Sequence, residues 1–419
     1  MPEARVFLAK LFGLTLSQRV SLVGIGMGAE KTLTLEGKKA FDEAELLIGA
    51  KRMTDAVQRP GQMVLHEYRS DKIVEYIKTH PQYRTVAIAL SGDVGFYSGA
   101  RKLIDLLDGD VQVICGISSV VYFMAKIGLS WDDARIVSAH GRDCNLIALI
   151  RHNPKVFSIL GTEDGVARLA SRLVAYGMGD VTLYVGENLS YENEKIFHAS
   201  AAELTEYRGD ALSVVTACNE KAVPLPAVHG ICDEEFLRGK APMTKEEVRT
   251  VSLSKLRLQE DSVCYDVGAG TGSVSVEMAL RAWKGQVYAI EKKEDALALL
   301  KENRRKFATD NLEIVPGTAP EAMVELPVPT HAFIGGSSGN MNEIIRLLLD
   351  KNPKVRIVIN CITLETVTEA MNAIRDFSLT DVDIVQLSAA RSKSIGRYHM
   401  MMGENPIYII SCSGRGEEI

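Results

Sequence analysis

The segment Asp266–Gly272, D-V-G-A-G-T-G, constrains the fold more than any other part of this 419-residue chain. It follows a short apolar run and precedes a helical pattern, and Glu291 stands at the end of the next apolar run, Val287–Ile290. An acidic residue about 20 positions beyond a strand–glycine–helix turn is the spacing that brings a carboxylate to a bound ribose. The pattern therefore predicts an α/β unit that holds an adenosine-containing cofactor.

The spacing of the glycines separates two candidate cofactors. A nicotinamide site needs G-x-G-x-x-G, and position 273 carries Ser273 instead of the last glycine. The spacing G-x-G-x-G, with an aspartate two residues ahead, is typical of S-adenosylmethionine (SAM) methyltransferases. SAM has no phosphate, so the glycines mainly let the backbone approach the cofactor without a Cβ clash. We predict that Glu291 accepts hydrogen bonds from the ribose and that the turn contacts SAM through Gly268, Ala269, Gly270, Thr271 and Gly272.

Length and local composition indicate two domains, because a single core rarely grows to this size. Short apolar runs alternate with helical patterns throughout, which predicts an α/β fold. The pattern breaks at 221–232, where two prolines and a glycine indicate a linker. We therefore expect an N-terminal extension (1–18), a first domain (19–220), the linker and a second domain (233–419).

The second domain is expected to hold a mostly parallel sheet that two late strands complete. A capping-box pattern at Thr244 and Glu247 predicts a helix that runs to about Leu258. No helical pattern separates the late runs Asp381–Leu387 and Pro406–Cys412, so we expect them to pair as antiparallel neighbours.

Composition narrows the partners and the compartment. The net charge of −6 argues against nucleic acid as a general partner. No apolar stretch reaches the ~18 residues that a membrane span needs, so we expect no membrane partner. The seven cysteines form no C-x-x-C pair, which favours thiols in a reducing cytoplasm over disulfides or a metal site.

The first domain carries a different glycine pattern, V-G-I-G-M-G at Val23–Gly28. No acidic residue ends the next apolar run, so a nicotinamide site is not expected there. Two further glycine-bearing turns, Ser91–Tyr97 and Gly116–Ser119, also follow predicted strands. Open α/β sheets bind ligands at the carboxyl ends of their strands, which makes all three turns candidates for one site.

Taken together, the three turns of the first domain resemble those of the tetrapyrrole (class III) methyltransferases. That family has two α/β subdomains with a cleft between them. Its strings are close to V-G-x-G-P-G, G-D-P-x-F-Y and P-G-I-S-S, and this chain has Met27, Val94 and Cys115 where proline is common. The resemblance implies a SAM site formed by Met27, Ser91, Gly92, Asp93, Ser118 and Ser119.

The second domain resembles the decarboxylating precorrin methyltransferases, which have a Rossmann-like class I fold with a seven-stranded, mostly parallel sheet. Similar segments lie at 233–249, 266–277, 317–321, 333–337 and 362–366. The resemblance adds Thr244 and Ala319 to the predicted SAM site. In this order, the two halves resemble fused enzymes of cobalamin synthesis. This resemblance implies that each domain binds one SAM. It also implies that the first domain methylates carbon 5, and that the second removes carbon dioxide and methylates carbon 15.

A polycarboxylate tetrapyrrole needs basic residues at its binding site. We predict that these residues are His140, Arg142, Arg391, Lys393 and Arg397, the last three lying between the two late strands. The base that accepts the released proton stays open among His140, Glu187, Asp233 and Glu234. We also expect a homo-oligomer.

Three alternative functions remain open at this point. One is a pair of methyltransferase domains acting on another tetrapyrrole or small substrate, on RNA or on a diphthamide precursor. Another is a nicotinamide oxidoreductase, which Ser273 disfavours. The last is a sensor or scaffold in which one domain has lost catalysis.

Overall fold

The computed structural model describes residues 18–107, 111–139, 145–224 and 230–415. The chain divides into two compact units. The first comprises 1–140, 154–171 and 179–220, and the second comprises 141–153, 172–178 and 221–419. His140 and Arg142, which the sequence predicts to bind substrate, lie outside the described residues.

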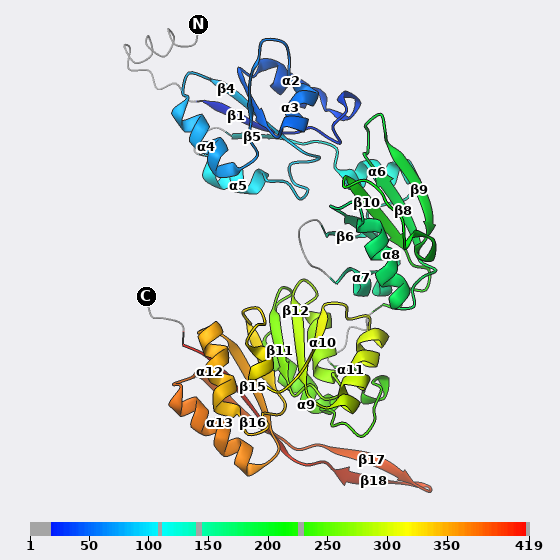
Figure 1. The fold of residues 1–419 in the computed structure, drawn as a ribbon, viewed down its shortest axis with the longest axis vertical. Coiled ribbons are helices and arrows are strands. Elements are labelled where there is room, and N and C mark those ends of the chain that lie inside the picture. Colours follow the sequence, from blue (N-terminus) through cyan, green and yellow to red (C-terminus); the bar gives the residue numbers. More distant parts are fainter. Residues whose placement is uncertain (1–17, 108–110, 140–144, 225–229, 416–419) are drawn as a thin grey trace. The chain divides into compact units, whose positions relative to one another are not determined.

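The first unit begins with a parallel sheet of strand order β3-β2-β4-β1-β5. Figure 1 labels β1, β4 and β5 of this sheet. Its strands are short apolar runs because helices cover both faces. Val20 and Leu22 pack with residues of α4 and α5, whereas Val23 packs with α2. The elements are β1 (Arg19–Gly24), η1 (Glu30–Thr32), α2 (Leu35–Glu43), β2 (Leu46–Gly49), α3 (Lys51–Val57), β3 (Met63–His66), α4 (Ser70–Thr79), β4 (Thr85–Leu90), α5 (Ala100–Leu106) and β5 (Val111–Ile114).

A second five-stranded sheet, of order β6-β7-β10-β8-β9, completes the first unit. β6 and β7 are parallel, and the other neighbours are antiparallel. The sequence patterns indicate all of these strands except β9, which lies at an edge of the sheet. The elements of this region are α6 (Ser119–Ile127), β6 (Arg135–Ser138), β7 (Lys155–Ile159), α8 (Gly165–Ala175), β8 (Thr182–Glu187), β9 (Lys195–Ser200), η2 (Ala201–Leu204) and β10 (Ser213–Cys218). The intervening helix α7 (Leu146–His152) and residues 172–175 of α8 belong to the second unit.

The second unit contains a seven-stranded sheet of order β13-β12-β11-β14-β15-β19-β16, which confirms the predicted class I architecture. The first five strands in this order are parallel, and β19 is antiparallel to both β15 and β16. Apolar clusters cover both faces. The elements are η3 (Asp233–Glu235), α9 (Glu246–Leu256), β11 (Val263–Val267), α10 (Ser273–Arg281), β12 (Gln286–Glu291), α11 (Glu294–Lys306), β13 (Leu312–Pro316), η4 (Glu321–Met323), β14 (His331–Ile334), α12 (Met341–Lys351), β15 (Arg356–Cys361), α13 (Leu364–Asp376), β16 (Thr380–Leu387) and β19 (Ile407–Ser413).

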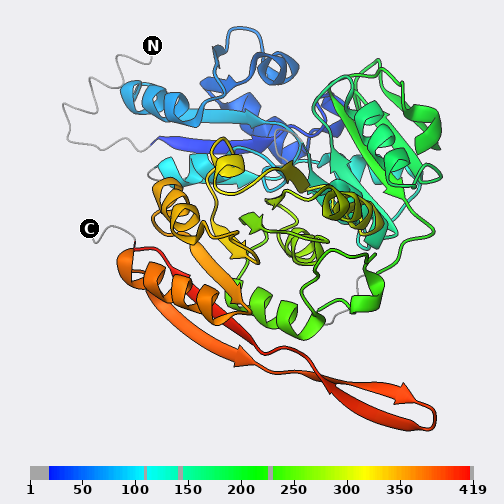
Figure 2. The ribbon, with the colours of Figure 1, turned by 60° about the horizontal axis from the view of Figure 1, so that its bottom comes forward.

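One local expectation for the second unit is wrong, and another, the antiparallel pairing of the late strands β16 and β19, is confirmed. The N-cap of α9 is Lys245, with no side-chain hydrogen bond, so Thr244 and Glu247 form no capping box. Glu247 instead accepts two hydrogen bonds from the guanidinium of Arg391. The connection between β16 and β19 is itself a hairpin, β17 (Ala390–Ile395) and β18 (Tyr398–Gly403), which extends from the sheet as a narrow ribbon (Figure 2).

Among the described residues, no helix combines the length and the apolar character needed to cross a membrane.

Candidate functional site

The turn between β11 and α10 needs its glycines. Gly268 and Gly270 have φ angles of +77° and +56°, in the left-handed region that residues with a Cβ rarely adopt. A Cβ on Gly268 would lie 2.9 Å from the backbone nitrogen and oxygen of Gly336. One on Gly270 would lie 2.6 Å from the carbonyl oxygen of Pro242. The turn is therefore a bare backbone surface held between β14 and the segment before α9.

Glu291 ends β12 beside this turn, and the backbone holds its carboxylate on both sides. Oε2 accepts from the N–H of Gly270 at 2.9 Å, and Oε1 accepts from the N–H groups of Lys292 and Lys293 at 2.8 and 2.9 Å. The side chain is 9% exposed and faces a pocket. A carboxylate that is fixed before a ligand arrives can accept hydroxyl hydrogen bonds with little loss of side-chain entropy.

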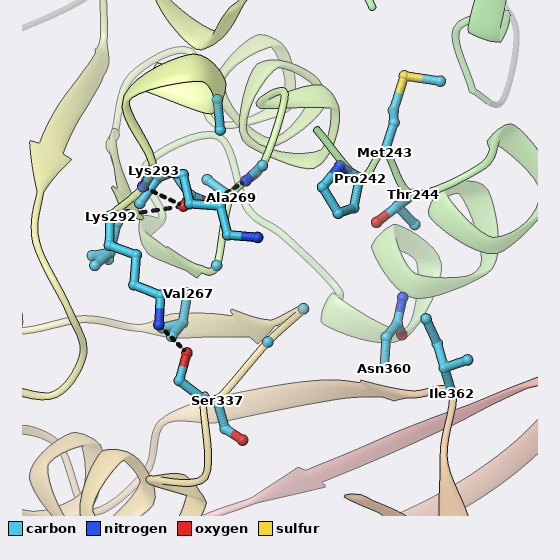
Figure 3. A pocket seen from close by; sticks show the side chains of 18 of the residues that line it. Pro242, Met243, Thr244, Val267, Ala269, Lys292, Lys293, Ser337, Asn360 and Ile362 are labelled. Carbon is cyan, nitrogen blue, oxygen red and sulfur yellow. Dashed lines mark hydrogen bonds between the residues drawn. The ribbon is translucent and has the colours of Figure 1, made fainter. Parts of the chain in front are cut away.

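The pocket over the carboxyl ends of the parallel strands has a volume of about 430 Å³, within the range of about 300–1,000 Å³ for small-molecule sites. Figure 3 shows part of its lining. Six of the predicted SAM residues line it: Thr244, Gly268, Ala269, Gly270, Glu291 and Ala319. Thr271 and Gly272 are not in the lining. The Thr271 carbonyl accepts from Asn303 Nδ2, and Gly272 caps α10.

Asp266, two residues ahead of the first glycine, forms a hydrogen bond with α10, the helix that follows the turn. Its side chain is completely buried, and the Ser275 hydroxyl donates to Oδ2. Oδ1 has no hydrogen-bond partner among the described residues. Burial, and to a smaller extent the charge of Glu291, raises the pKa of Asp266 to about 7, although the Ser275 hydrogen bond acts in the opposite direction.

The basic residues of this pocket are not those that the sequence predicts. Lys245, Lys292 and Lys293 line it, and Lys292 Nζ donates to Ser338 Oγ at 3.0 Å. Lys393 and Arg397 lie on the exposed hairpin and are absent from the lining. The lysines are sequence neighbours of Thr244 and Glu291, and that proximity is the signal that could have identified them.

Arg391, the third predicted basic residue, is bound by protein carboxylates. It donates to both oxygens of Glu247 at 3.0 and 2.8 Å and lies 3.4 Å from Asp233 Oδ2. Asp233 is fully buried and also contacts Arg249, a fully buried arginine whose Nε lies 2.5 Å from Glu277 Oε1. Asp233, a candidate base in the sequence, is absent from the pocket lining. This ion-pair network joins the base of the hairpin to α9 and α10.

The first unit contains its own pocket, of about 310 Å³ (the first pocket), and the pocket beside Glu291 is the second pocket. Four predicted SAM residues line it: Met27, Ser91, Gly92 and Ser119. Asp93 and Ser118 do not line it, and both bind backbone instead. Asp93 accepts from the N–H groups of Gly95 and Gly116 at 2.8 and 3.1 Å, and Ser118 caps α6 by accepting from Val121.

The three glycine-bearing turns of the first unit pack against one another. A Cβ on Gly116 would lie 2.3 Å from the carbonyl oxygen of Gly92 and 2.6 Å from that of Gly24. The first loop therefore closes the ends of β1, β4 and β5 together, and Met27, the one residue of that loop predicted to bind SAM, lines the pocket. Sequence reasoning missed Arg52 and Tyr191, which line the pocket and share a hydrogen bond of 2.7 Å.

The second unit matches a family described as the precorrin methyltransferase domain, over residues 235–413, and residues 19–205 match the tetrapyrrole (corrin/porphyrin) methylases. A probable cobalt-precorrin-6B C(15)-methyltransferase (decarboxylating) of Pyrobaculum calidifontis is 44% identical over 188 residues, which are 44% of this chain and 96% of that protein. A cobalt-precorrin-6B C(15)-methyltransferase (decarboxylating) of Salmonella typhimurium is 41% identical over 182 residues, 43% of this chain and 94% of that protein. A crystal structure titled precorrin-6y C5,15-methyltransferase, from Geobacter metallireducens, is 40% identical, with a TM-score of 0.41, over 44% of this chain and 95% of that one.

The glycine pocket and the two family matches define a methyltransferase whose methyl donor is SAM. The chain belongs, through its second unit, to the family of the decarboxylating cobalt-precorrin-6B C(15)-methyltransferases, and a segment that matches the tetrapyrrole methylases precedes that unit.

Proposed function

We propose that this chain methylates precorrin-6B at carbons 5 and 15 and removes carbon dioxide from its C12 acetate side chain, giving precorrin-8 for cobalamin synthesis. The observation that carries the proposal is the presence of both family segments, 19–205 and 235–413, on one chain. We assign carbon 5 to a first domain at 19–220. Decarboxylation and carbon 15 are assigned to a second domain at 233–419, with 1–18 as an extension and 221–232 as the linker.

Each pocket is proposed to hold one SAM. In the second unit the residues fit this cofactor, because the turn leaves no room for a Cβ at Gly268 or Gly270 and Glu291 is already fixed. Glu291 would bind the ribose, and the turn, with Thr244 and Ala319, would enclose the rest. In the first unit we assign SAM to Met27, Ser91, Gly92 and Ser119, with Asp93 and Ser118 holding the turns. When bound, SAM supplies an electrophilic methyl group.

The protein's part in the reaction is mainly to bind and orient two reactants, which can supply roughly 7–11 kcal/mol of the rate enhancement. The macrocycle carries several carboxylates, and Lys245, Lys292 and Lys293 give the second pocket cationic groups to meet them. We retain Lys393 and Arg397 as proposed contacts from the hairpin. Arg391 is better supported as a residue that positions the hairpin, since Glu247 and Asp233 bind it.

Mass spectrometry of precorrin-6B incubated with the enzyme and SAM tests the proposal. We expect a product with two added methyl groups and one lost carbon dioxide. Glu291→Ala should give a product methylated at carbon 5 that keeps its acetate, because only the second pocket is damaged. A substrate whose mass is unchanged by the wild-type enzyme would overturn the proposal. Loss of both methylations in Glu291→Ala would overturn the division of labour.

We also propose a cytoplasmic homo-oligomer. Support for the compartment comes from six described cysteines that are free thiols. Support for assembly comes from the hairpin, where Tyr398, Met400, Met401 and Met402 are exposed. Light scattering on the full chain measures the assembly, and a monomer at micromolar concentration would contradict it.

A further inference from the structure

Asn360, a residue of the second pocket's lining, has a buried amide nitrogen that no described residue satisfies. It lies near the carboxyl end of β15, lines the pocket and is 9% exposed. Its Oδ1 accepts from Ser252 Oγ at 3.0 Å, and its Nδ2 has no hydrogen-bond partner among the described residues. Buried amide groups are nearly always paired, so an unpaired donor on a pocket wall points to an acceptor on a ligand.

Ser252 fixes the orientation of this amide. The serine is fully buried on α9, and its hydroxyl lies between the Val248 carbonyl, at 2.8 Å, and Asn360 Oδ1. The contact turns Oδ1 toward α9 and leaves Nδ2 on the other side of the amide. A side chain held in this way loses little freedom when a ligand binds.

Asn360 lies on β15, which β14 separates from β11, the strand whose glycine turn is assigned to SAM. In Figure 3, Asn360 lies with Thr244, Met243 and Ile362 on one side of the pocket, and Lys292, Lys293 and Ser337 lie on the other. Met243 and Ile362 give this side apolar surface, which suits the face of a macrocycle. An N–H donor among them suits a carboxylate, because hydrogen bonds to a charged oxygen are short and strong.

We propose that Asn360 Nδ2 donates to a carboxylate side chain of the tetrapyrrole and that Ser252 positions it to do so. This inference rests on the proposed function, because it takes the macrocycle as the ligand. Asn360 is then a substrate-binding residue, and Ser252 is a positioning residue.

Asn360→Asp tests the proposal, since it keeps the shape and replaces the donor with a repelling carboxylate. Two affinities are measured on the full chain: SAM by calorimetry, and uroporphyrin, a stable tetrapyrrole with acetate and propionate side chains, by fluorescence titration. We expect uroporphyrin affinity to fall about tenfold or more while SAM affinity stays within about twofold. With precorrin-6B, the KM of decarboxylation should rise more than kcat falls. Ser252→Ala should shift KM in the same direction by a smaller factor, and Asn372→Asp, which adds the same charge on α13 away from the pocket, should leave both affinities unchanged.

The outcomes separate this inference from the proposed function. Unchanged uroporphyrin affinity in Asn360→Asp overturns the inference. Tighter SAM binding by Asn360→Asp also overturns the inference, because the new carboxylate would then attract the ammonium group of SAM. In the wild type, the Asn360 amide would then face the cofactor. If the wild type binds uroporphyrin through Asn360 and yet decarboxylates nothing, the proposed function fails and the inference stands. If the wild type neither binds nor decarboxylates, both fail.

Discussion

Gly116 and Gly270 both follow parallel strands, and a Cβ on either would meet backbone, but only Gly270 also lines a pocket. Gly116 lies against the backbone of two other turns, and the absence of a Cβ leaves space for that backbone. Gly270 lies on a pocket wall beside a carboxylate that its own N–H group holds. The first arrangement closes the ends of three strands, and the second leaves a strand end open to a ligand. Glycines after strands thus allow close backbone packing in both units, and at Gly270 the same residue also forms part of a binding surface.

The largest effect that this contrast predicts is on folding of the first unit. In Gly116→Ala the new Cβ would meet carbonyl oxygens of Gly92 and Gly24 at 2.3 and 2.6 Å, and no flexible side chain is there to move. We expect a loss of about 3 kcal/mol or more in the stability of the first unit. Hydrogen exchange of peptides from β1 and β5 measures it.

The matched control is Gly99→Ala, where a Cβ would meet nothing within 4 Å and the φ angle is −75°. This variant should exchange like the wild type. SAM binding by the second unit should survive in both variants. If β1 and β5 are equally protected in Gly116→Ala and the wild type, the packing explanation is wrong.

The next effect is on SAM affinity in the second unit. In Glu291→Gln the new amide nitrogen would face a backbone N–H group on either side, because both carboxylate oxygens accept such hydrogen bonds. We expect SAM affinity to fall by about 2–3 kcal/mol, roughly 30- to 150-fold. Calorimetry measures it, with the exposed Glu294→Gln as control. Affinity equal to that of the wild type would show that Glu291 does not bind the cofactor.

Most of the sheets could be predicted from the sequence because their strands are buried on both faces and read as apolar runs. The strands β9, β17 and β18 could not be predicted, because only a buried strand needs a continuous run of apolar residues. The hairpin residues are almost all exposed, and β9 is an edge strand that is only partly buried. Their sequences therefore resemble those of connecting loops.

The residues of the candidate site also fall into a group that the sequence predicts and a group that it does not. The glycines and Glu291 can be recognised in the sequence from their spacing along one βαβ unit. Asn360 does not, because its role depends on the β15 register that turns it toward α9 and on a serine 108 positions earlier. Arg391 looked free for a substrate because its partners, Asp233 and Glu247, are more than a hundred residues away. Spacing within one unit can be read from sequence, whereas pairing across a sheet cannot.

A smaller effect is the dependence of stability on pH, which we expect not at the turn after β1 but at the turn between β11 and α10. Asp266 precedes that turn as a buried acid, whereas Leu22 occupies the same place before Gly24. Because the folded-state pKa of Asp266 is raised from 3.8 to about 7, the folded protein binds the extra proton. Its contribution to stability is complete below about pH 4 and is lost as pH rises through 7.

We expect the second unit to lose about 2 kcal/mol of stability between pH 5 and 8 through this group. Asp266→Asn should remove that slope, and at pH 8 it should be no less stable than the wild type. Hydrogen exchange of peptides from β11 and α10 at several pH values measures the slope, with β1 as the internal reference. Equal slopes in the variant and the wild type would show that Asp266 stays ionised in the folded protein.

The smallest effect tests whether the two turns differ at all in how they treat the cofactor. Asp93 and Glu291 are both carboxylates that bind backbone N–H groups, but Glu291 lines its pocket and Asp93 does not. Asp93→Asn keeps one acceptor oxygen and weakens the hold on one turn, either at Gly95 or at Gly116. We therefore expect SAM affinity in the first unit to fall by only about 0.5–1 kcal/mol. Two-site calorimetry measures it, with the exposed Asp105→Asn as control. A loss as large as that of Glu291→Gln would mean that Asp93 contacts the cofactor directly, and the contrast between a packing turn and a binding turn would no longer hold.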